Sequence, residues 1–169
     1  MPRAKKESVV AKKEEVPKTE PAKSPDTLSY YEGIGRRKES TARVRLYVVG
    51  DETAVEGAVL QKGFFLVNDR PIETYFMGEV NKKLYLEPFR TTNTLSRFAT
   101  TIRTEGGGHM GQLSAVILGI SRALEKVDKD KFRPILKKRD FLTRDSRIKQ
   151  RRKAGFAGKA RARKQSPKR

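Results

Sequence analysis

The positive charge of this 169-residue chain is concentrated at one end, and that distribution limits which part of the chain can fold. Residues 129–169 carry 18 Lys and Arg against 3 Asp, whereas residues 33–128 carry 14 basic and 11 acidic residues. From residue 139 onward the large apolar residues are Phe141, Leu142, Ile148 and Phe156. So few apolar side chains cannot bury enough surface to offset the entropy lost on ordering. We therefore expect residues 139–169 to form a long, extended basic tail.

The beginning of the chain also lacks the pattern of a folded segment. Residues 1–28 mix Lys, Glu, Pro, Ser and Ala without hydrophobic periodicity, which is typical of disorder. A transit peptide would be poor in acidic residues, and this segment is not. The expected organisation is a disordered N-terminal extension at 1–28, one globular domain at 29–138 and the tail at 139–169.

Composition excludes several classes of function. The chain contains no Cys and one His, so it has no disulfide framework, no thiol nucleophile and too few ligands for a zinc site. No apolar run reaches the roughly 18 residues of a membrane-spanning helix. We expect a cytoplasmic protein without cofactor, metal or membrane partner. The formal net charge of +19 indicates nucleic acid as the leading partner.

Hydrophobic periodicity in the middle of the chain predicts a compact α/β domain. Alternation of apolar and polar residues predicts strands at residues 42–49 and 96–104, and the run FFLVN before the turn Asp-Arg-Pro predicts a further strand at 64–68. Residues 78–89 are expected to form a short helix or an irregular link that ends near Pro88. Apolar residues at helical spacing over 113–127 then form a stripe that covers the inner face of the sheet, and 132–140 resembles another short helix. The expected fold class is α+β, a two-layer α/β sandwich with helices on one face.

The run TEGGGHMG at 104–111 matches the dinucleotide-binding pattern G-x-G-x-x-G at the start of the predicted helix. In a dinucleotide site, a second parallel strand follows the helix and carries an acid for the ribose. Asp128 and Asp130 follow the glycines at about the distance that such an acid requires. However, a second helical pattern follows them instead of a strand, so we discount dinucleotide binding. Two interpretations remain open: a tight turn with close backbone approach, or a helix N-terminus whose amides bind a phosphate of a polymer.

The sequence gives little support for catalytic residues. His109 is the only histidine, and without a nucleophile beside it we expect a loop or packing histidine. In a basic neighbourhood, Glu125, Asp140 and Asp145 are expected to orient nearby Arg and Lys. The sequence therefore indicates no enzyme and no catalytic residues. A nucleotide-dependent enzyme built on the glycine loop and a basic DNA-compacting protein are the rival interpretations.

Two basic clusters fit a phosphate polymer. The stretch GIGRRK at 33–38 places three cations beside two glycines just before the first predicted strand. A flexible backbone there would let the charges follow a phosphate chain; the alternative is a solvated loop. In the tail, Lys and Arg neutralise phosphates while Gly155 and Gly158 allow bends. Because the tail offers no aromatic platform beyond isolated Phe residues, we expect recognition mostly of the shape and the phosphates of a nucleic acid.

Three collinear motifs resemble one protein family. They are GIGRRKESTARVRL at 33–46, GGGHMGQLSAVILGISRAL at 106–124 and FLTRDSRIKQRRKAG at 141–155. Together with the terminal Lys168-Arg169 they are similar to the bacterial form of the ninth protein of the small ribosomal subunit, from about Tyr31 to Arg169. The resemblance implies a left-handed β-α-β crossover in the two-layer fold. It also implies a structural constituent of the 30S head, in the cytoplasm, that binds 16S rRNA and lies beside neighbouring head proteins.

The resemblance also implies a contact with tRNA. The family's terminal Ser-Lys-Arg corresponds to Pro167-Lys168-Arg169 here, with Ser166 where an aromatic residue usually stands. Lys168 and Arg169 are expected to approach the anticodon stem-loop of the P-site tRNA. The residues expected to bind 16S rRNA are Arg36, Arg37, Lys38, Gly107, Gly108, Gln112, Lys137, Lys138, Arg139, Arg144, Arg147, Arg151, Arg152, Lys153, Lys159, Arg161, Arg163 and Lys164.

Overall fold

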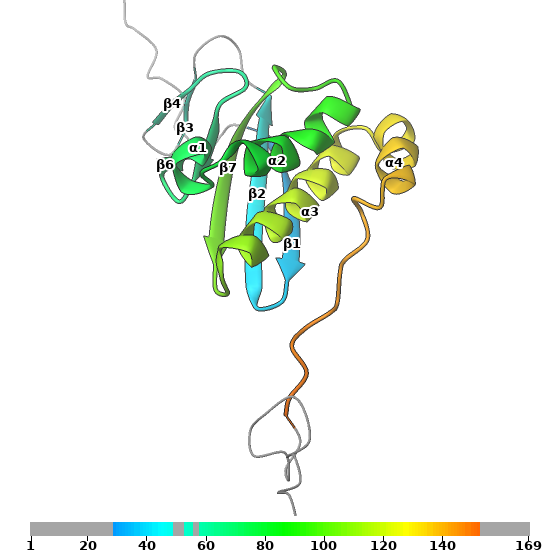
Figure 1. The fold of residues 1–169 in the computed structure, drawn as a ribbon. Coiled ribbons are helices and arrows are strands. Elements are labelled where there is room, and N and C mark those ends of the chain that lie inside the picture. Colours follow the sequence, from blue (N-terminus) through cyan, green and yellow to red (C-terminus); the bar gives the residue numbers. More distant parts are fainter. Residues whose placement is uncertain (1–28, 49–52, 56–57, 153–169) are drawn as a thin grey trace, which may run out of the picture.

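The computed structural model describes residues 29–48, 53–55 and 58–152, and the rest of the chain lies outside this description (Figure 1). One sheet contains β1 (Tyr30–Arg37), β2 (Ser40–Val48), β7 (Phe98–Glu105), β5 (Phe65–Val67) and β6 (Arg70–Pro71), in that spatial order. A separate pair contains β3 (Thr53–Val55) and β4 (Ala58–Leu60). The helices are α1 (Ile72–Tyr75), α2 (Glu79–Thr91), α3 (His109–Val127) and α4 (Lys129–Lys138). Within the described ranges no helix has the length and apolar character needed to cross a bilayer.

The sheet combines antiparallel and parallel pairing. β2 pairs antiparallel with both β1 and β7, whereas β5 and β7 are parallel. A parallel pair requires a crossover connection, and here the chain passes through β6, α1 and α2 between the two strands. The fold is therefore a mixed α/β structure with one main sheet and several helices, and α3 crosses the face of β1 and β2 (Figure 1).

The core lies between β2 and α3, as the two periodicities predicted. Ala42, Val44 and Leu46 are buried on alternate positions of β2. The stripe of α3 faces them, and its fully buried members are Leu113, Val116, Ile120 and Leu124. The predicted strands at 42–49, 64–68 and 96–104 are confirmed as β2, β5 and β7, and the short helix predicted over 132–140 is confirmed as α4.

The prediction of a flexible loop at 33–38 was wrong, because this stretch forms most of β1 and the turn after it. A Cβ at Gly35 would lie 1.9 Å from the Ala115 carbonyl oxygen, and one at Gly33 would lie 2.1 Å from the Gly119 carbonyl oxygen. The two glycines thus let the backbone of β1 lie directly on α3. Their role is close packing rather than flexibility.

The helical alternative predicted for residues 78–89 is confirmed as α2, but the helix ends at Thr91 and not near Pro88. Proline removes one backbone donor from a helix. The buried side chain of Phe89, 1% exposed, fixes this last turn in the core. The hydroxyl of Thr92 donates to the Pro88 carbonyl oxygen at 3.0 Å. Tertiary packing therefore outweighs the local preference of proline to end a helix.

Candidate nucleic-acid interface

The glycine loop between β7 and α3 is seated on the turn of the β1–β2 hairpin. Gly106 and Gly107 have φ of 69° and 61°, a left-handed conformation that favours glycine. A Cβ at Gly106 would lie 2.6 Å from the Glu39 carbonyl oxygen, and one at Gly107 would lie 2.1 Å from Ser40 Oγ. The tight-turn interpretation is therefore confirmed for these two glycines.

Gly108 differs from its neighbours because it faces open space. It is the N-cap of α3 in an extended conformation, and a Cβ there would meet no atom within 4 Å. No side chain caps this helix end, and the first turn contains no acid. Such a terminus presents backbone N–H groups and the positive end of the helix dipole. Phosphate binding at this end remains compatible with the geometry.

Gln112 and His109 hold the glycine loop in place through hydrogen bonds with Tyr75. The Gln112 amide accepts a hydrogen bond from the Tyr75 hydroxyl at 2.8 Å and donates to the Gly106 carbonyl oxygen at 3.1 Å. His109 Nε2 lies 2.9 Å from the Tyr75 carbonyl oxygen, and its ring packs edge-on against Phe76. The expected packing role of His109 is confirmed. Gln112, expected to bind RNA, uses both ends of its amide within the protein.

The segment after α3 removes the basis for a dinucleotide site. The Asp128 side chain accepts a hydrogen bond from the Lys131 backbone N–H at 3.2 Å and caps α4. The acid that could have bound a ribose therefore starts a helix instead of ending a strand. Within the described residues no group of His, Asp or Glu could hold a metal ion.

A cluster that we call the hairpin clamp joins the end of β1 to the start of the tail. Arg37 Nη2 lies 3.0 Å from Asp145 Oδ2, and Arg37 Nη1 donates to the Arg147 carbonyl oxygen. Asp145 also receives the Arg147 backbone N–H at 3.0 Å and the Arg147 guanidinium, with Nη2 at 2.7 Å. The guanidinium of Arg147 is the largest cause that holds the pKa of Asp145 well below its usual range.

The clamp changes the interpretation of Arg37. Its side chain is 16% exposed and contacts protein groups, whereas its neighbours Arg36 and Lys38 are exposed. In the part of the chain that the structure describes, neither Arg36 nor Lys38 forms an ion pair. The two neighbours are therefore available to a ligand at the hairpin end, while Arg37 fixes the root of the tail.

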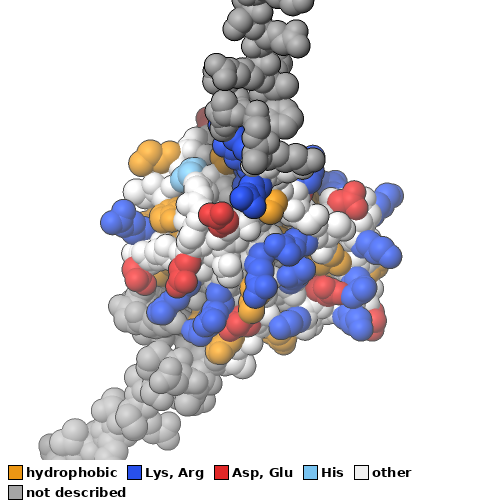
Figure 2. Space-filling model, turned by 90° about the horizontal axis from the view of Figure 1, so that it is seen from below, with side chains coloured by type: hydrophobic (Ala, Val, Ile, Leu, Met, Phe, Trp, Pro, Cys, Tyr) orange, Lys and Arg blue, Asp and Glu red, His pale blue; other side chains and the backbone are white. Residues whose placement is uncertain are grey.

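The other described cations that the sequence predicted to bind RNA lie at two places. Lys137 and Lys138 are exposed in the last turn of α4, and Arg139 Nη1 lies 3.2 Å from Glu87 Oε1. Beyond them lie residues 140–152, the described start of the tail, which we call the tail root. Its exposed cations are Arg144, Arg147, Lys149, Arg151 and Arg152. Figure 2 shows Lys and Arg side chains spread over the face seen from below, with fewer acids among them. The tail root connects the end of α4 with the hairpin end.

Two of the three acids orient cations, as predicted. Glu125 forms an ion pair with Arg133, and Asp145 is part of the hairpin clamp. Asp140 instead adopts a positive φ of 57° after α4, and it forms no ion pair with a described residue. The predicted contacts of Lys153, Lys159, Arg161, Arg163, Lys164, Lys168 and Arg169 fall outside the described residues.

Sequence reasoning missed the partners within the clamp and the packing role of the hairpin glycines. Arg37 and Asp145 are separated by 108 positions, and no local pattern indicates that they meet. The repeated small residues at 33, 35, 115, 119 and 123 were the available signal for the close approach of β1 to α3.

Comparison with known proteins is consistent with this interface. The family model described as ribosomal protein S9/S16 matches residues 35–169. The small ribosomal subunit protein uS9 of Cutibacterium acnes is 40% identical over 135 residues, which cover 80% of this chain and 71% of that protein. The chain therefore belongs to the ribosomal protein S9/S16 family, whose members are structural, rRNA-binding proteins of the small ribosomal subunit.

Proposed function

We propose that this chain binds 16S rRNA in the head of the 30S subunit through one continuous basic surface. The surface combines Arg36 and Lys38 at the hairpin end, the exposed start of α3 at Gly107 and Gly108, and the basic tail. The observation that carries this proposal is the hairpin clamp, because it brings the root of the tail to the hairpin on which the glycine loop also rests.

The chemistry of the surface suits phosphates rather than bases. Guanidinium and ammonium groups neutralise phosphates, and the uncapped amides at the start of α3 add neutral donors. Arg37 contributes by fixing where the tail leaves the domain. The other cations that we place in this interface are Lys137, Lys138, Arg139, Arg144, Arg147, Arg151, Arg152, Lys153, Lys159, Arg161, Arg163 and Lys164, with Gln112 supporting the loop.

The role that follows is structural. A protein that neutralises phosphates of a folded RNA stabilises that fold without chemistry of its own, and proteins of the 30S head would lie beside it. We also propose the organisation expected from the sequence, with an N-terminal extension at 1–28, a globular domain at 29–138 and a tail at 139–169. The crossover between β5 and β7 would be left-handed, as the resemblance implied.

The end of the tail is proposed to reach the P site. Lys168 and Arg169 offer two cations at the end of this sequence, each suited to a charge-assisted contact with a phosphate of the tRNA anticodon stem-loop. Contacts of this kind position a nucleic acid without reading its bases. We expect all tRNAs to benefit similarly.

Binding of the full chain to 16S rRNA tests the first proposal. Competition with duplex DNA at fixed salt should show preference for the folded RNA, whereas equal affinity for both would favour a DNA-compacting protein. Titration with NAD or ATP should show no saturable binding at sub-millimolar ligand. Micromolar affinity that is lost in Gly108→Val would favour a nucleotide-dependent protein instead.

Removal of Lys168 and Arg169 tests the tRNA contact. Filter binding of several tRNAs to 30S subunits that contain the shortened protein should show similarly weakened P-site binding for each tRNA. Unchanged affinity for every tRNA would contradict the contact. Loss of the protein from the subunit would show that the two residues anchor the tail to rRNA.

A further inference from the structure

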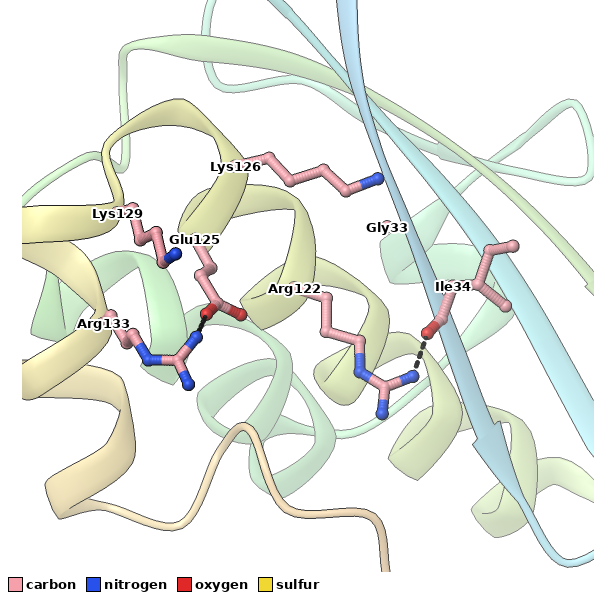
Figure 3. A pocket seen from close by; sticks show the side chains of 7 residues that line it. All are labelled: Gly33, Ile34, Arg122, Glu125, Lys126, Lys129 and Arg133. Atoms are coloured by element: carbon pink, nitrogen blue, oxygen red, sulfur yellow. Dashed lines mark hydrogen bonds and ion pairs between the residues drawn. The ribbon is translucent and has the colours of Figure 1, made fainter.

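A groove of about 620 Å³ lies between the edge strand β1 and the helices α3 and α4 (Figure 3). Four cations and one acid line it, together with Gly33 and Ile34 of β1: Arg122, Lys126, Lys129, Arg133 and Glu125. Arg122 and Lys126 of α3, and Lys129 and Arg133 of α4, are each four positions apart, which places the two side chains of each pair on one side of their helix. None of them was among the residues that the sequence predicted to bind RNA.

Both arginines of the groove are held in place by protein contacts. Arg122 Nη1 donates to the Ile34 carbonyl oxygen at 2.7 Å, and Arg133 is paired with Glu125. A guanidinium carries five N–H donors, so these contacts orient each group while leaving donors for a ligand. Groups ordered in advance lose less side-chain entropy when a ligand binds.

The lysines and the edge strand supply further donors. Lys126 and Lys129 are exposed, and neither forms an ion pair with any described residue. Since Ile34 is in an antiparallel edge strand and its carbonyl oxygen faces Arg122, its N–H points to the same side. With one acid against four cations, the side chains of the groove carry a net charge of +3.

We infer that this groove binds a phosphate of the RNA backbone, as a second contact of the domain with the rRNA; the inference rests on the proposed function. Fork-shaped guanidinium groups, ammonium groups and a backbone amide are the donors that phosphate oxygens accept. The tail root runs from the end of α4 to the far end of β1, where Arg37 holds it. An RNA strand that follows the tail root from Arg37 to α4 would thereby reach the helix that supplies Lys129 and Arg133 to the groove.

Paired charge-removal variants of the full chain test the inference. The groove variant is Lys126→Gln with Lys129→Gln, and the matched control is Lys83→Gln with Lys131→Gln, two exposed lysines of α2 and α4 that do not line the groove. Binding to 16S rRNA is measured over a range of salt concentrations. Loss of this one phosphate contact makes the slope of log K against log salt shallower by about 0.9. At 0.1 M salt this corresponds to a loss of roughly eightfold in affinity, while the control matches the unchanged chain.

The outcomes separate the inference from the proposed function. If the unchanged chain itself fails to bind 16S rRNA, the proposed function fails and the groove contact fails with it. If the unchanged chain binds and the groove and control variants are weakened equally, the groove contact alone is overturned. Normal RNA binding by the groove variant, together with its exclusion from reconstituted subunits, would assign the groove to an acidic protein segment and also overturn the inference. Equal thermal unfolding midpoints of both variants exclude misfolding as the cause.

Discussion

At the scale of single residues, glycine is used in this protein for two different physical reasons. Gly106 and Gly107 adopt positive φ in the loop before α3, whereas Gly33 and Gly35 are required because a Cβ would enter the backbone of α3. Gly108 meets neither condition. These glycines therefore differ in how well they tolerate substitution.

We expect Gly35→Ala to lower the free energy of unfolding by about 1–3 kcal/mol, because overpacking a well-packed contact costs this much. The new Cβ would lie 1.9 Å from the Ala115 carbonyl oxygen, and backbone has to move. Gly108→Ala is the control, with an expected loss of about 1 kcal/mol or less at an N-cap. Denaturant unfolding measures both. Equal losses would show that β1 does not lie on α3 as described.

The carboxyl group of Asp145 is expected to titrate well below the ordinary Asp value of about 3.9. Its pKa is lowered mainly by the Arg147 guanidinium and less by Arg37. Because the pKa of Asp145 is lower in the folded than in the unfolded chain, its ionised form stabilises the fold. This stabilisation is complete at a pH above the pKa of the unfolded chain and is lost as the pH falls through the pKa of the folded chain. Carbon NMR of the carboxyl group should show a larger upward pKa shift in Arg147→Ala than in Arg37→Ala. The reverse order would contradict the assigned cause.

At the scale of elements, the hairpin clamp decides how the chain leaves the domain. Residues 143–152 have no helix or strand of their own, so their path is fixed by contacts with β1. Arg37 lies at the end of β1, and its mostly buried side chain forms an ion pair with Asp145 of the tail root. The ion pair and the hydrogen bonds of the hairpin clamp therefore fix the direction in which residues 143–152 leave the domain.

Release of the clamp is expected to expose the tail root without unfolding the domain. In Arg37→Ala, trypsin should cleave after Arg144 and Arg147 several-fold faster, because local opening becomes more frequent. Arg36→Ala, which removes an exposed cation one position away, is the control and should leave the cleavage rate unchanged. Mass spectrometry of the early fragments measures both rates. Equal rates in the two variants would show that the clamp does not hold this segment.

At the scale of the whole molecule, charge and core belong to different parts of the chain. Residues 149–169 contain ten Lys and Arg and no acid, whereas the buried side chains belong to residues 40–136. The tail root connects the two parts, because Phe141 and Leu142 pack against the core. Loss of the charged part should therefore affect RNA binding far more than folding.

Deletion of 149–169 is expected to remove most of the salt dependence of RNA binding while the domain unfolds at an unchanged temperature. If the full chain neutralises roughly 6–10 phosphates, its affinity falls on the order of 10³- to 10⁵-fold between 50 and 200 mM salt. The shortened chain should show a much flatter response. Deletion of 1–28, which has 7 basic and 5 acidic residues, is the control and should keep the slope. A steep slope in the shortened chain would contradict a phosphate-tracking tail.

Several features of the protein were determined by local sequence alone. Period-two alternation specified β2 and β7, and period-three-to-four spacing specified α3, because each pattern reports which side of an element is buried. The local sequence also predicted that no strand follows α3, since Asp128 precedes a second helical pattern. The segregation of charge in the last 41 residues was sufficient to indicate a polyanionic partner, because charge count needs no tertiary information.

Only the tertiary structure decided the roles of particular side chains. Gly33 and Gly35 were interpreted as flexible, and Arg37 as a phosphate ligand, because the sequence does not show that α3 and Asp145 lie against them. Lys126 and Lys129 became a candidate site only when α3, α4 and β1 were seen to enclose one groove. In each case the deciding contact joins residues far apart in the chain, and such contacts depend on how elements pack rather than on local preference.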